Sequence, residues 1–145
     1  MIQLFQFHFI IISFGLNIIN NFSVFLNIME YTITTILNTD IAYFKRSGPI
    51  DLHVRKDNRK CILDYCMKFN LNKVIVDARD QESALSIIEC FNFGAETAVL
   101  MKRLRIAVLH READESIDYT VNAASSRGMK IRGFLEKSEA IQWLS

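Results

Sequence analysis

Cysteine is scarce in this sequence, and its spacing matches no metal site. The three cysteines, Cys61, Cys66 and Cys90, are an odd number and include no C-x-x-C pair. Two of them fall inside apolar helical patterns, where a free cysteine behaves as a small hydrophobic residue. We therefore expect neither a zinc site nor a disulfide framework, and we expect the domain to reside in a reducing compartment, the cytoplasm.

An excess of charge of one sign is also lacking. The 17 Lys and Arg residues against 16 Asp and Glu residues leave a net charge of +1. This balance lacks the basic character that binds nucleic acid, so we expect no nucleic-acid partner. A length of 145 residues, 50% of them hydrophobic, fits a single domain with one core.

Residues 1–28 contain no charged residue at all. They are mostly Phe, Ile, Leu and Asn, which A/T-rich DNA encodes when it is read through, and ordinary composition begins at Met29. Our first interpretation is a misassigned start, with true initiation at Met29. The second is a membrane anchor, because the segment is long and uncharged enough to span a bilayer, although no closely flanking Lys or Arg sets its orientation. A signal peptide fits less well, because the positive n-region is missing.

Residues 29–145 carry the patterns of one α/β domain. β-branched alternation predicts a strand at 31–37, and a turn through Asn38 and Asp40 predicts a return strand from residue 41. Further strands are expected at 73–77, 105–110 and 129–135, and helices at 55–70, 83–102, 114–128 and 138–145. Because strands separated by helices need crossover connections, we expect a mixed sheet of about five strands, an N-terminal hairpin plus parallel strands, packed with about four helices.

The spacing also predicts which helix faces are buried. For helix 83–102 the predicted inward stripe is Leu85, Ile88, Phe91, Ala95, Ala98 and Val99. For helix 55–70 the predicted inward residues are Ile62, Tyr65, Cys66 and Phe69. The cations near its start are interpreted as a solvated face, with a partner-binding patch as the alternative; they are Arg55, Lys56, Arg59 and Lys60. Pro49 is expected in the first turn of this helix, and Ser83 and Ser138 are expected as N-caps of later ones.

Four polar residues follow two of the predicted buried strands. Asp77, Arg79, His110 and Arg111 should collect at the carboxyl ends of these strands, where open α/β sheets usually bind ligands. A histidine beside a carboxylate is a candidate for acid–base chemistry. However, no nucleophile accompanies them, and no glycine-rich loop follows either strand to hold a phosphate. We therefore expect no catalytic residue and name these four as candidate residues for binding a ligand or a partner.

The order of elements, together with four stretches of sequence, resembles a known family. The stretches are VIVDAR, FNFGAETAVLMKRLRIAVLH, AASSRGMKIRGF and EAIQWL, and over residues 31–145 they are similar to the small bacterial SpoIIAA-like proteins of the STAS (sulfate transporter and anti-sigma antagonist) superfamily. The resemblance implies a mixed sheet packed with helices, no cofactor and no enzymatic chemistry. It also implies a role in protein interaction or signalling in a bacterial cytoplasm.

The resemblance raises the question of whether Ser83 is a phosphosite. In the anti-sigma antagonists, a serine at the start of the helix after the third strand is phosphorylated by a partner kinase, and Ser83 is the nearest match. That subfamily carries an Asp-Ser-Ser-Gly type sequence there, whereas this chain has Gln81-Glu82-Ser83-Ala84. Asp80 and Glu82 would also repel an added phosphate. We predict that Ser83 is a helix cap and not a regulated phosphosite.

Two functions of different class remain open. The first is a non-enzymatic interaction or regulatory module, whose partner is a protein and could be a second copy of this chain. The second is a carrier of a small apolar or anionic ligand, as lipid-binding relatives of this architecture are, with its site at the carboxyl edge of the sheet or in an apolar pocket between helix and sheet. An exposed apolar patch would favour the first and an apolar cavity the second. Membrane contact is expected only if residues 1–28 are a real anchor.

Overall fold

A hairpin opens the main sheet. In the computed structural model, which describes residues 31–145, β1 (Tyr31–Thr35) pairs antiparallel with β2 (Ile41–Arg46). The connecting turn places Asn38 at a φ of 60°, a left-handed conformation that asparagine tolerates better than most residues. The two interpretations of residues 1–28 lie outside the described residues.

Three parallel strands continue the sheet from β2. They are β4 (Lys73–Asp77), β6 (Arg105–Leu109) and β7 (Lys130–Phe134), which gives the order β1-β2-β4-β6-β7. β4 and β6 are direct neighbours, with Val74 opposite Ile106. Most of their residues are buried, which explains why both strands are continuous apolar runs in the sequence. The mixed five-stranded sheet and the adjacency of β4 and β6 confirm the prediction.

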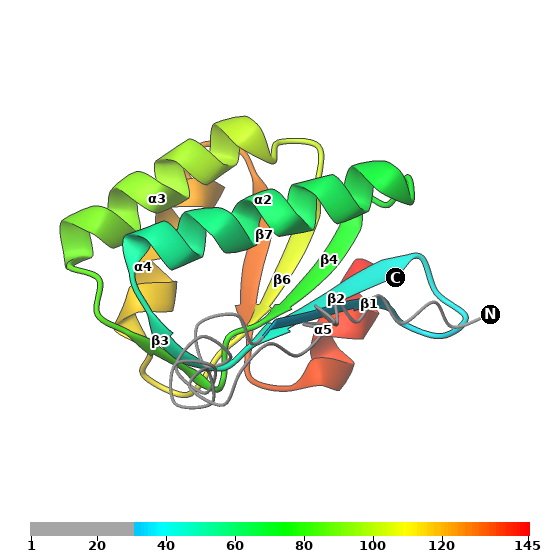
Figure 1. The fold of residues 1–145 in the computed structure, drawn as a ribbon, viewed down its shortest axis with the longest axis horizontal. Coiled ribbons are helices and arrows are strands. Elements are labelled where there is room, and N and C mark those ends of the chain that lie inside the picture. The colour runs from blue at the N-terminus through cyan, green and yellow to red at the C-terminus, as the bar shows by residue number, and fades with distance from the viewer. Residues whose placement is uncertain (1–30) are drawn as a thin grey trace, which may run out of the picture.

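The described residues form four helices, as predicted, and these cover both faces of the sheet. α2 (Leu52–Lys68), α3 (Ile87–Leu100) and α4 (Glu115–Ser125) lie on one face, and α5 (Lys137–Leu144) lies on the other (Figure 1). Because side chains alternate along a strand, each central strand contributes to two cores. Val74 packs with the α2–α4 side, and Ile75 packs with α5. Within residues 31–145, none of the helices combines the length and the apolar character needed to cross a bilayer.

A second, two-stranded sheet corrects the predicted start of the first helix. β3 (Gly48–Ile50) and β5 (Gln81–Ser83) pair in parallel, so Pro49 lies in a strand and not in a helical turn. α2 begins at Leu52, after Asp51, whose carboxylate accepts a hydrogen bond from the Val54 backbone N–H at 2.8 Å. Strands of three residues are too short to show a periodic pattern, and for this reason they were not predicted.

Both predicted serine caps are wrong. Ser83 belongs to β5, and the N-cap of α3 is Ser86, three residues later, so the helix begins at Ile87. Ser86 and Glu89 form a capping box: the Ser86 hydroxyl accepts from the Glu89 N–H at 3.3 Å, and the Glu89 carboxylate accepts from the Ser86 N–H at 2.8 Å. Ser138 is already inside α5, whose N-cap position is occupied by Glu136 without a side-chain capping bond.

The interpretation of the α2 cations as one solvated face is also wrong. Lys56 and Lys60 are exposed, but Arg55 and Arg59 are buried. Residues 55, 59, 62 and 66 follow one another at helical spacing, so the two arginines share the inward face with Ile62 and Cys66. Their spacing, and not their charge, decides their position. Phe69, predicted as an inward residue, is only half-buried beyond the end of the helix.

α3 turns a different face to the core from the one predicted. Its buried residues are Cys90, Phe93, Gly94, Thr97 and Ala98, whereas Ile88, Phe91 and Val99 of the predicted stripe are exposed. The reason is close packing against α4. A Cβ on Gly94 would lie 2.4 Å from the Thr120 carbonyl oxygen and 2.9 Å from the Ala123 Cβ, so only a glycine face can approach α4 so closely. Ile88, Phe91 and Val99 consequently point outward.

All three cysteines lie in the helical layer formed by α2 and α3. Cys66 and Cys90 are buried, Cys61 is half-buried, and all three are free thiols. Burial raises the pKa of the Cys66 thiol to about 11. Cys66 and Cys90 therefore behave as small core residues, as their apolar surroundings in the sequence predict.

Candidate functional site

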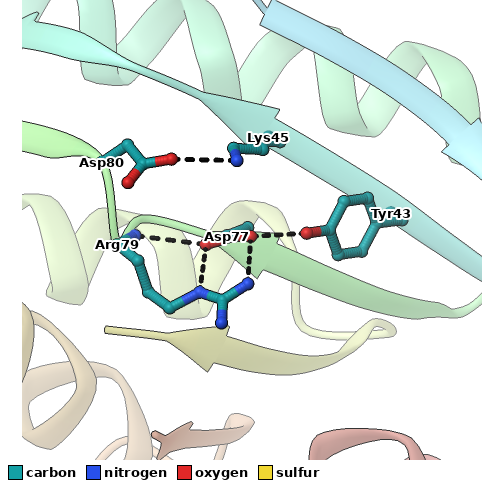
Figure 2. A network of polar contacts seen from close by, with 5 residues as sticks. All are labelled: Tyr43, Lys45, Asp77, Arg79 and Asp80. Atoms are coloured by element: carbon teal, nitrogen blue, oxygen red, sulfur yellow. Dashed lines mark hydrogen bonds and ion pairs between the residues drawn. The ribbon is translucent and has the colours of Figure 1, made fainter. Parts of the chain in front are cut away.

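Asp77 ends β4 and is the centre of a polar network at the carboxyl edge of the sheet (Figure 2). Its carboxylate is fully buried. The Arg79 guanidinium donates two hydrogen bonds to it, from Nε at 2.9 Å and from Nη2 at 2.8 Å, and the Tyr43 hydroxyl on β2 donates a third. The structure thus brings together two of the four predicted residues, Asp77 and Arg79, and adds Tyr43, which was not predicted.

This network fixes the protonation states of its members. Burial raises the pKa of Asp77, but the hydrogen bonds from Arg79 and Tyr43 outweigh it and lower that pKa from 3.8 to about 2. Burial and the bond to the Asp77 carboxylate raise the pKa of Tyr43 to about 12. At neutral pH Asp77 is therefore a charged, fully bonded carboxylate. Such a group is a weak general base, because efficient proton transfer needs a pKa near the working pH.

Further contacts tie the loop after β4 to the strand ends. Lys45 forms an ion pair with Asp80 at 2.9 Å (Figure 2), and the Asp80 carbonyl accepts from the Gly48 N–H at 2.9 Å. Arg111, another of the predicted residues, donates from Nη2 to the Gln81 carbonyl at 2.9 Å. The side chain of Arg111 therefore holds β5 in place in this structure.

His110, the fourth predicted residue, lies on a different side of this edge. Its Nδ1 is 2.8 Å from the Arg111 carbonyl oxygen, and its ring lies against Gly133, where a Cβ would be only 2.6 Å from Nε2. In the part of the chain that the structure describes, no hydrogen bond or ion pair joins His110 to Asp77. His110 and Asp77 therefore lie in separate environments and do not form an acid–base pair in this structure. Ligand binding by the four residues stays a prediction.

His110 lines an open groove of about 500 Å³ between β7 and α5. This volume is in the range of small-molecule sites, roughly 300–1,000 Å³. The Trp143 ring in its wall contacts the Arg105 guanidinium, 4.3 Å from the ring centre, and the Phe134 ring, whose centre is 5.6 Å away. The full lining is His110, Arg132, Gly133, Phe134, Leu135, Glu139, Gln142 and Trp143.

A smaller cavity of about 80 Å³ lies between α2, α3, α4 and the sheet. Most of its lining is aliphatic or aromatic, but Arg55 and Arg59 of α2 also contribute to the wall. Sequence reasoning missed these two residues as site candidates. The available signal was their spacing of four residues from each other and their alignment with Ile62 and Cys66.

The outward side of α3 is the third notable feature. We define the α3 outer face as Ile88, Phe91, Ala95 and Val99, with Ile87 and Leu100 at its sides. Ile88 is 71% exposed and Val99 is 76% exposed, and Ile87, Phe91 and Leu100 each expose about half of their surface. Among residues 31–145, no group of three or more His, Cys, Asp or Glu side chains is placed to hold a metal ion.

Comparison with known proteins finds a structural match but no match in sequence. No family model matches the chain, and no curated protein is significantly similar to it. Among solved structures, the chain is similar to an uncharacterised protein of the DUF3478 family from Shewanella loihica PV-4, described as having a SpoIIAA-like fold, with a TM-score of 0.51 and 13% sequence identity. The match covers 80% of this chain and 93% of that one.

The chain has a SpoIIAA-like fold. This confirms the fold expected from the resemblance in the sequence. Because one fold hosts many functions, the function of the SpoIIAA-like domain has to be argued from its own surfaces and cavities.

Proposed function

We propose that this SpoIIAA-like domain is a non-enzymatic interaction module that works by protein–protein contact through the α3 outer face, with a second copy of the chain as the partner. The observation that carries the proposal is the exposure of the apolar stripe of α3. Asp77 supports the absence of catalysis, because Arg79 and Tyr43 bond its carboxylate and leave it a weak base.

The size of the apolar surface fits a dimer. The five large apolar side chains of the α3 outer face and its sides expose about half of their surface or more, which amounts to on the order of 500 Å². Patches of this size on monomers are usually functional. Two copies packed face to face would bury roughly 1,000 Å² of apolar surface, and with a polar rim this approaches the lower end of stable interfaces, roughly 1,200 Å².

The face is also complementary to itself when two copies pack antiparallel. With a two-fold axis near Ala95, Phe91 of one copy meets Val99 of the other, and the small Ala95 side chains allow close approach at the crossing point. The start of α3 carries Glu89, and Lys102 and Arg103 follow its C-cap residue, Met101. The antiparallel arrangement therefore brings opposite charges together and also opposes the two helix dipoles.

Sedimentation analysis of the full-length chain tests this proposal. We expect the wild type to be a dimer and Val99→Glu to be a monomer with unchanged circular dichroism, because the new charge lies in the apolar contact. Met67→Glu is the matched control: Met67 is an apolar residue of α2 that is also mostly exposed, 64% against 76% for Val99, and its substitution should leave the dimer intact. A wild type that is monomeric at about 100 μM, or a dimer that survives Val99→Glu, refutes the proposal.

A second candidate function is that of a small-molecule carrier. The specific observation that supports it is the cavity between α2, α3, α4 and the sheet, because most of its wall is apolar and the buried Arg55 and Arg59 also line it. Binding pockets commonly have this composition, with few polar groups that orient the ligand.

A further inference from the structure

β7 is an edge strand of the main sheet. In the order β1-β2-β4-β6-β7 it pairs with β6 alone, at the end of the sheet opposite β1 (Figure 1). An edge strand presents a row of backbone N–H and C=O groups that no neighbouring strand satisfies, and another extended chain can pair with them. β7 can therefore take up a further strand wherever its edge is accessible.

The backbone groups in the middle of β7 face this free edge. The Phe134 carbonyl accepts a hydrogen bond from the His110 N–H at 3.1 Å, so the backbone groups of Phe134 point toward β6. Because these groups alternate in direction along a strand, those of Gly133 point away from β6. In agreement with this alternation, the Ile131 N–H bonds to the Met129 carbonyl, at 3.0 Å, and not to β6. Gly133 thus offers one donor and one acceptor to an added strand.

The open groove of about 500 Å³ borders this edge. Its wall includes the four consecutive residues 132–135, whose side chains point alternately to the two faces of the sheet. The groove therefore follows the edge of β7 and is not confined to one face. Residues of α5, among them Trp143, complete the wall. Because small-molecule sites usually enclose most of their ligand, an open groove along a strand fits an extended chain better.

Two exposed cations, Lys130 and Arg132, lie on β7. Alternation puts both on the same face of the strand as Phe134, whose ring centre is 5.2 Å from the Arg132 guanidinium. Among residues 31–145 neither cation forms an ion pair. Water solvates exposed charges, so these two need no partner for stability, but they decide which partner fits. The planar fork of Arg132 matches a carboxylate, to which it can donate two parallel hydrogen bonds.

The same cations disfavour pairing of β7 with a second copy of itself. A two-fold pairing centred on Arg132 places the two Arg132 side chains directly opposite each other, and one centred on Ile131 places Lys130 opposite Arg132. Like charges directly opposite each other destabilise a strand pair, and charged side chains on edge strands commonly prevent self-association. An acidic side chain opposite Arg132 replaces this repulsion with attraction. The charges therefore favour an acidic segment of a different protein.

We propose that β7 binds an extended segment of a partner protein, which adds a strand to the main sheet and carries one acidic residue and, two residues away, an aliphatic one. The acidic side chain pairs with Arg132, and the aliphatic side chain lies on the same face, against Phe134 and Trp143. Glu139 of α5 also lines the groove and limits the segment to a single acidic residue there. α5 and α3 cover opposite faces of the sheet, so this surface is separate from the α3 outer face and does not depend on the dimer proposed above.

Fluorescence titration of the full-length chain with a synthetic peptide tests the proposal. Trp143 is the only tryptophan of the sequence, so its emission reports directly on the groove. The probe is the acetylated and amidated peptide Val-Thr-Glu-Thr-Val, in which the order of side chains is the same in both directions. We expect a saturable change of Trp143 emission with a Kd below about 1 mM. No saturable change up to about 5 mM peptide refutes the proposal.

Two altered peptides separate the sources of affinity. Replacement of the glutamate by lysine should weaken binding at least about tenfold, because the new charge faces Arg132. Methylation of every backbone nitrogen keeps the side chains but removes the N–H donors of an added strand, and should abolish saturable binding. Equal binding of either altered peptide overturns the proposal.

A charge reversal on β7 assigns the binding to this strand. Arg132→Glu should keep the circular dichroism of the wild type, because residue 132 is exposed, and should bind the lysine peptide at least about tenfold more tightly than the glutamate peptide. Lys60→Glu is the control: its side chain is 73% exposed on α2, on the other face of the sheet, and the variant should bind like the wild type. An unchanged preference for the glutamate peptide in Arg132→Glu contradicts the proposal.

Sedimentation of the same samples keeps the two proposals apart. Val99→Glu should bind the peptide like the wild type, and Arg132→Glu should sediment like the wild type. A dimer whose Trp143 emission does not respond to the peptide refutes the β7 site and leaves the dimer intact. A monomeric wild type that binds the peptide through Arg132 refutes the dimer and leaves the β7 site intact.

Discussion

Asp77 is a buried carboxylate whose charge depends on two neighbours, Arg79 and Tyr43. The two oxygens of Asp77 accept hydrogen bonds from both side chains. Because Tyr43 belongs to β2, its bond links the end of β4 to the neighbouring strand. Removing Arg79 or Tyr43 leaves the buried Asp77 carboxylate with fewer partners, which costs more than the loss of the bonds alone.

The low pKa of Asp77 predicts a dependence of stability on pH. The pKa of the folded state, about 2, is below the ordinary value of 3.8, so the contribution to stability is fully present above pH 3.8. It is lost as the pH falls through the folded value. Asp77→Asn should therefore lower the free energy of unfolding at neutral pH by roughly 2 kcal/mol and should reduce the decline between about pH 4 and pH 2.

Urea denaturation at several pH values measures both effects. Asp80→Asn is the matched control, because Asp80 pairs with Lys45 at the same edge but its side chain is 55% exposed. Exposed pairs contribute little, so this change should cost less than about 1 kcal/mol. If Asp77→Asn is as mild as Asp80→Asn, the network does not stabilise the fold.

At the scale of elements, close packing of α3 against α4 decides which face of α3 is buried, although the outward face is also apolar. Gly94 touches the backbone of α4 at Thr120, and the neighbouring side chains at this crossing are small. The contact places Phe93 and Thr97 against the α2 side of the cavity and leaves Ile88 and Val99 outside. The exposed stripe and the cavity are thus two consequences of one helix crossing.

Substitution of Gly94 by alanine tests this crossing, because helix propensity and steric overlap change the stability in opposite directions. Alanine favours a helix over glycine by about 1 kcal/mol. Against this, the new Cβ would overlap the Thr120 carbonyl oxygen, which is backbone and cannot move away by changing rotamer. Overpacking typically costs about 1–3 kcal/mol, so we expect Gly94→Ala to be destabilising overall in urea denaturation. Asn92→Ala, at an exposed position of the same helix, should be neutral or slightly stabilising. A stabilising Gly94→Ala would show that the helices are not in close contact.

Local sequence patterns predicted which helices and strands are present better than they predicted where these elements begin. The buried strands are apolar runs, and the helices have clear periodicity, so the number and order of the main elements were predictable. Ser83 was not correctly placed, because Ser86 forms the better cap: it has Glu89 three residues later and completes a capping box. The short β3 and β5 depend on each other and have no pattern of their own.

At the scale of the whole molecule, the SpoIIAA-like architecture was predictable and the candidate sites were only partly so. Asp77 and Arg79 meet at the sheet edge because Asp77 is the last residue of β4 and Arg79 follows it by two residues. Asp77 ends β4 and His110 directly follows the adjacent strand β6, but Gly133 provides room for the imidazole over β7, and that room depends on a residue far away in the sequence. The burial of Arg55 likewise depends on α3 and α4, which supply its hydroxyl and thiol partners.

The three cysteines can report when α2 or α3 moves away from the core, because their thiols become accessible to an alkylating reagent. Cys66 and Cys90 belong to different helices, and both are shielded, so an alkylating reagent reaches them only when α2 or α3 moves away. The raised pKa of Cys66 further slows its reaction, because the thiolate is the reactive form. We expect one rapidly labelled site, Cys61, and two slowly labelled ones in mass spectra recorded over time.

Dilute urea then distinguishes two ways in which the layer can open. If α2 and α3 separate from the sheet as one cooperative unit, Cys66 and Cys90 should accelerate in parallel as urea is added. If each helix detaches alone, the two rates should diverge. Cys61→Ala, which should remove only the rapid phase, is the control. Equal labelling rates for all three thiols would contradict the shielding of Cys66 and Cys90. If these two are labelled more slowly than Cys61, the ratio of their rates measures how tightly the motions of α2 and α3 are coupled.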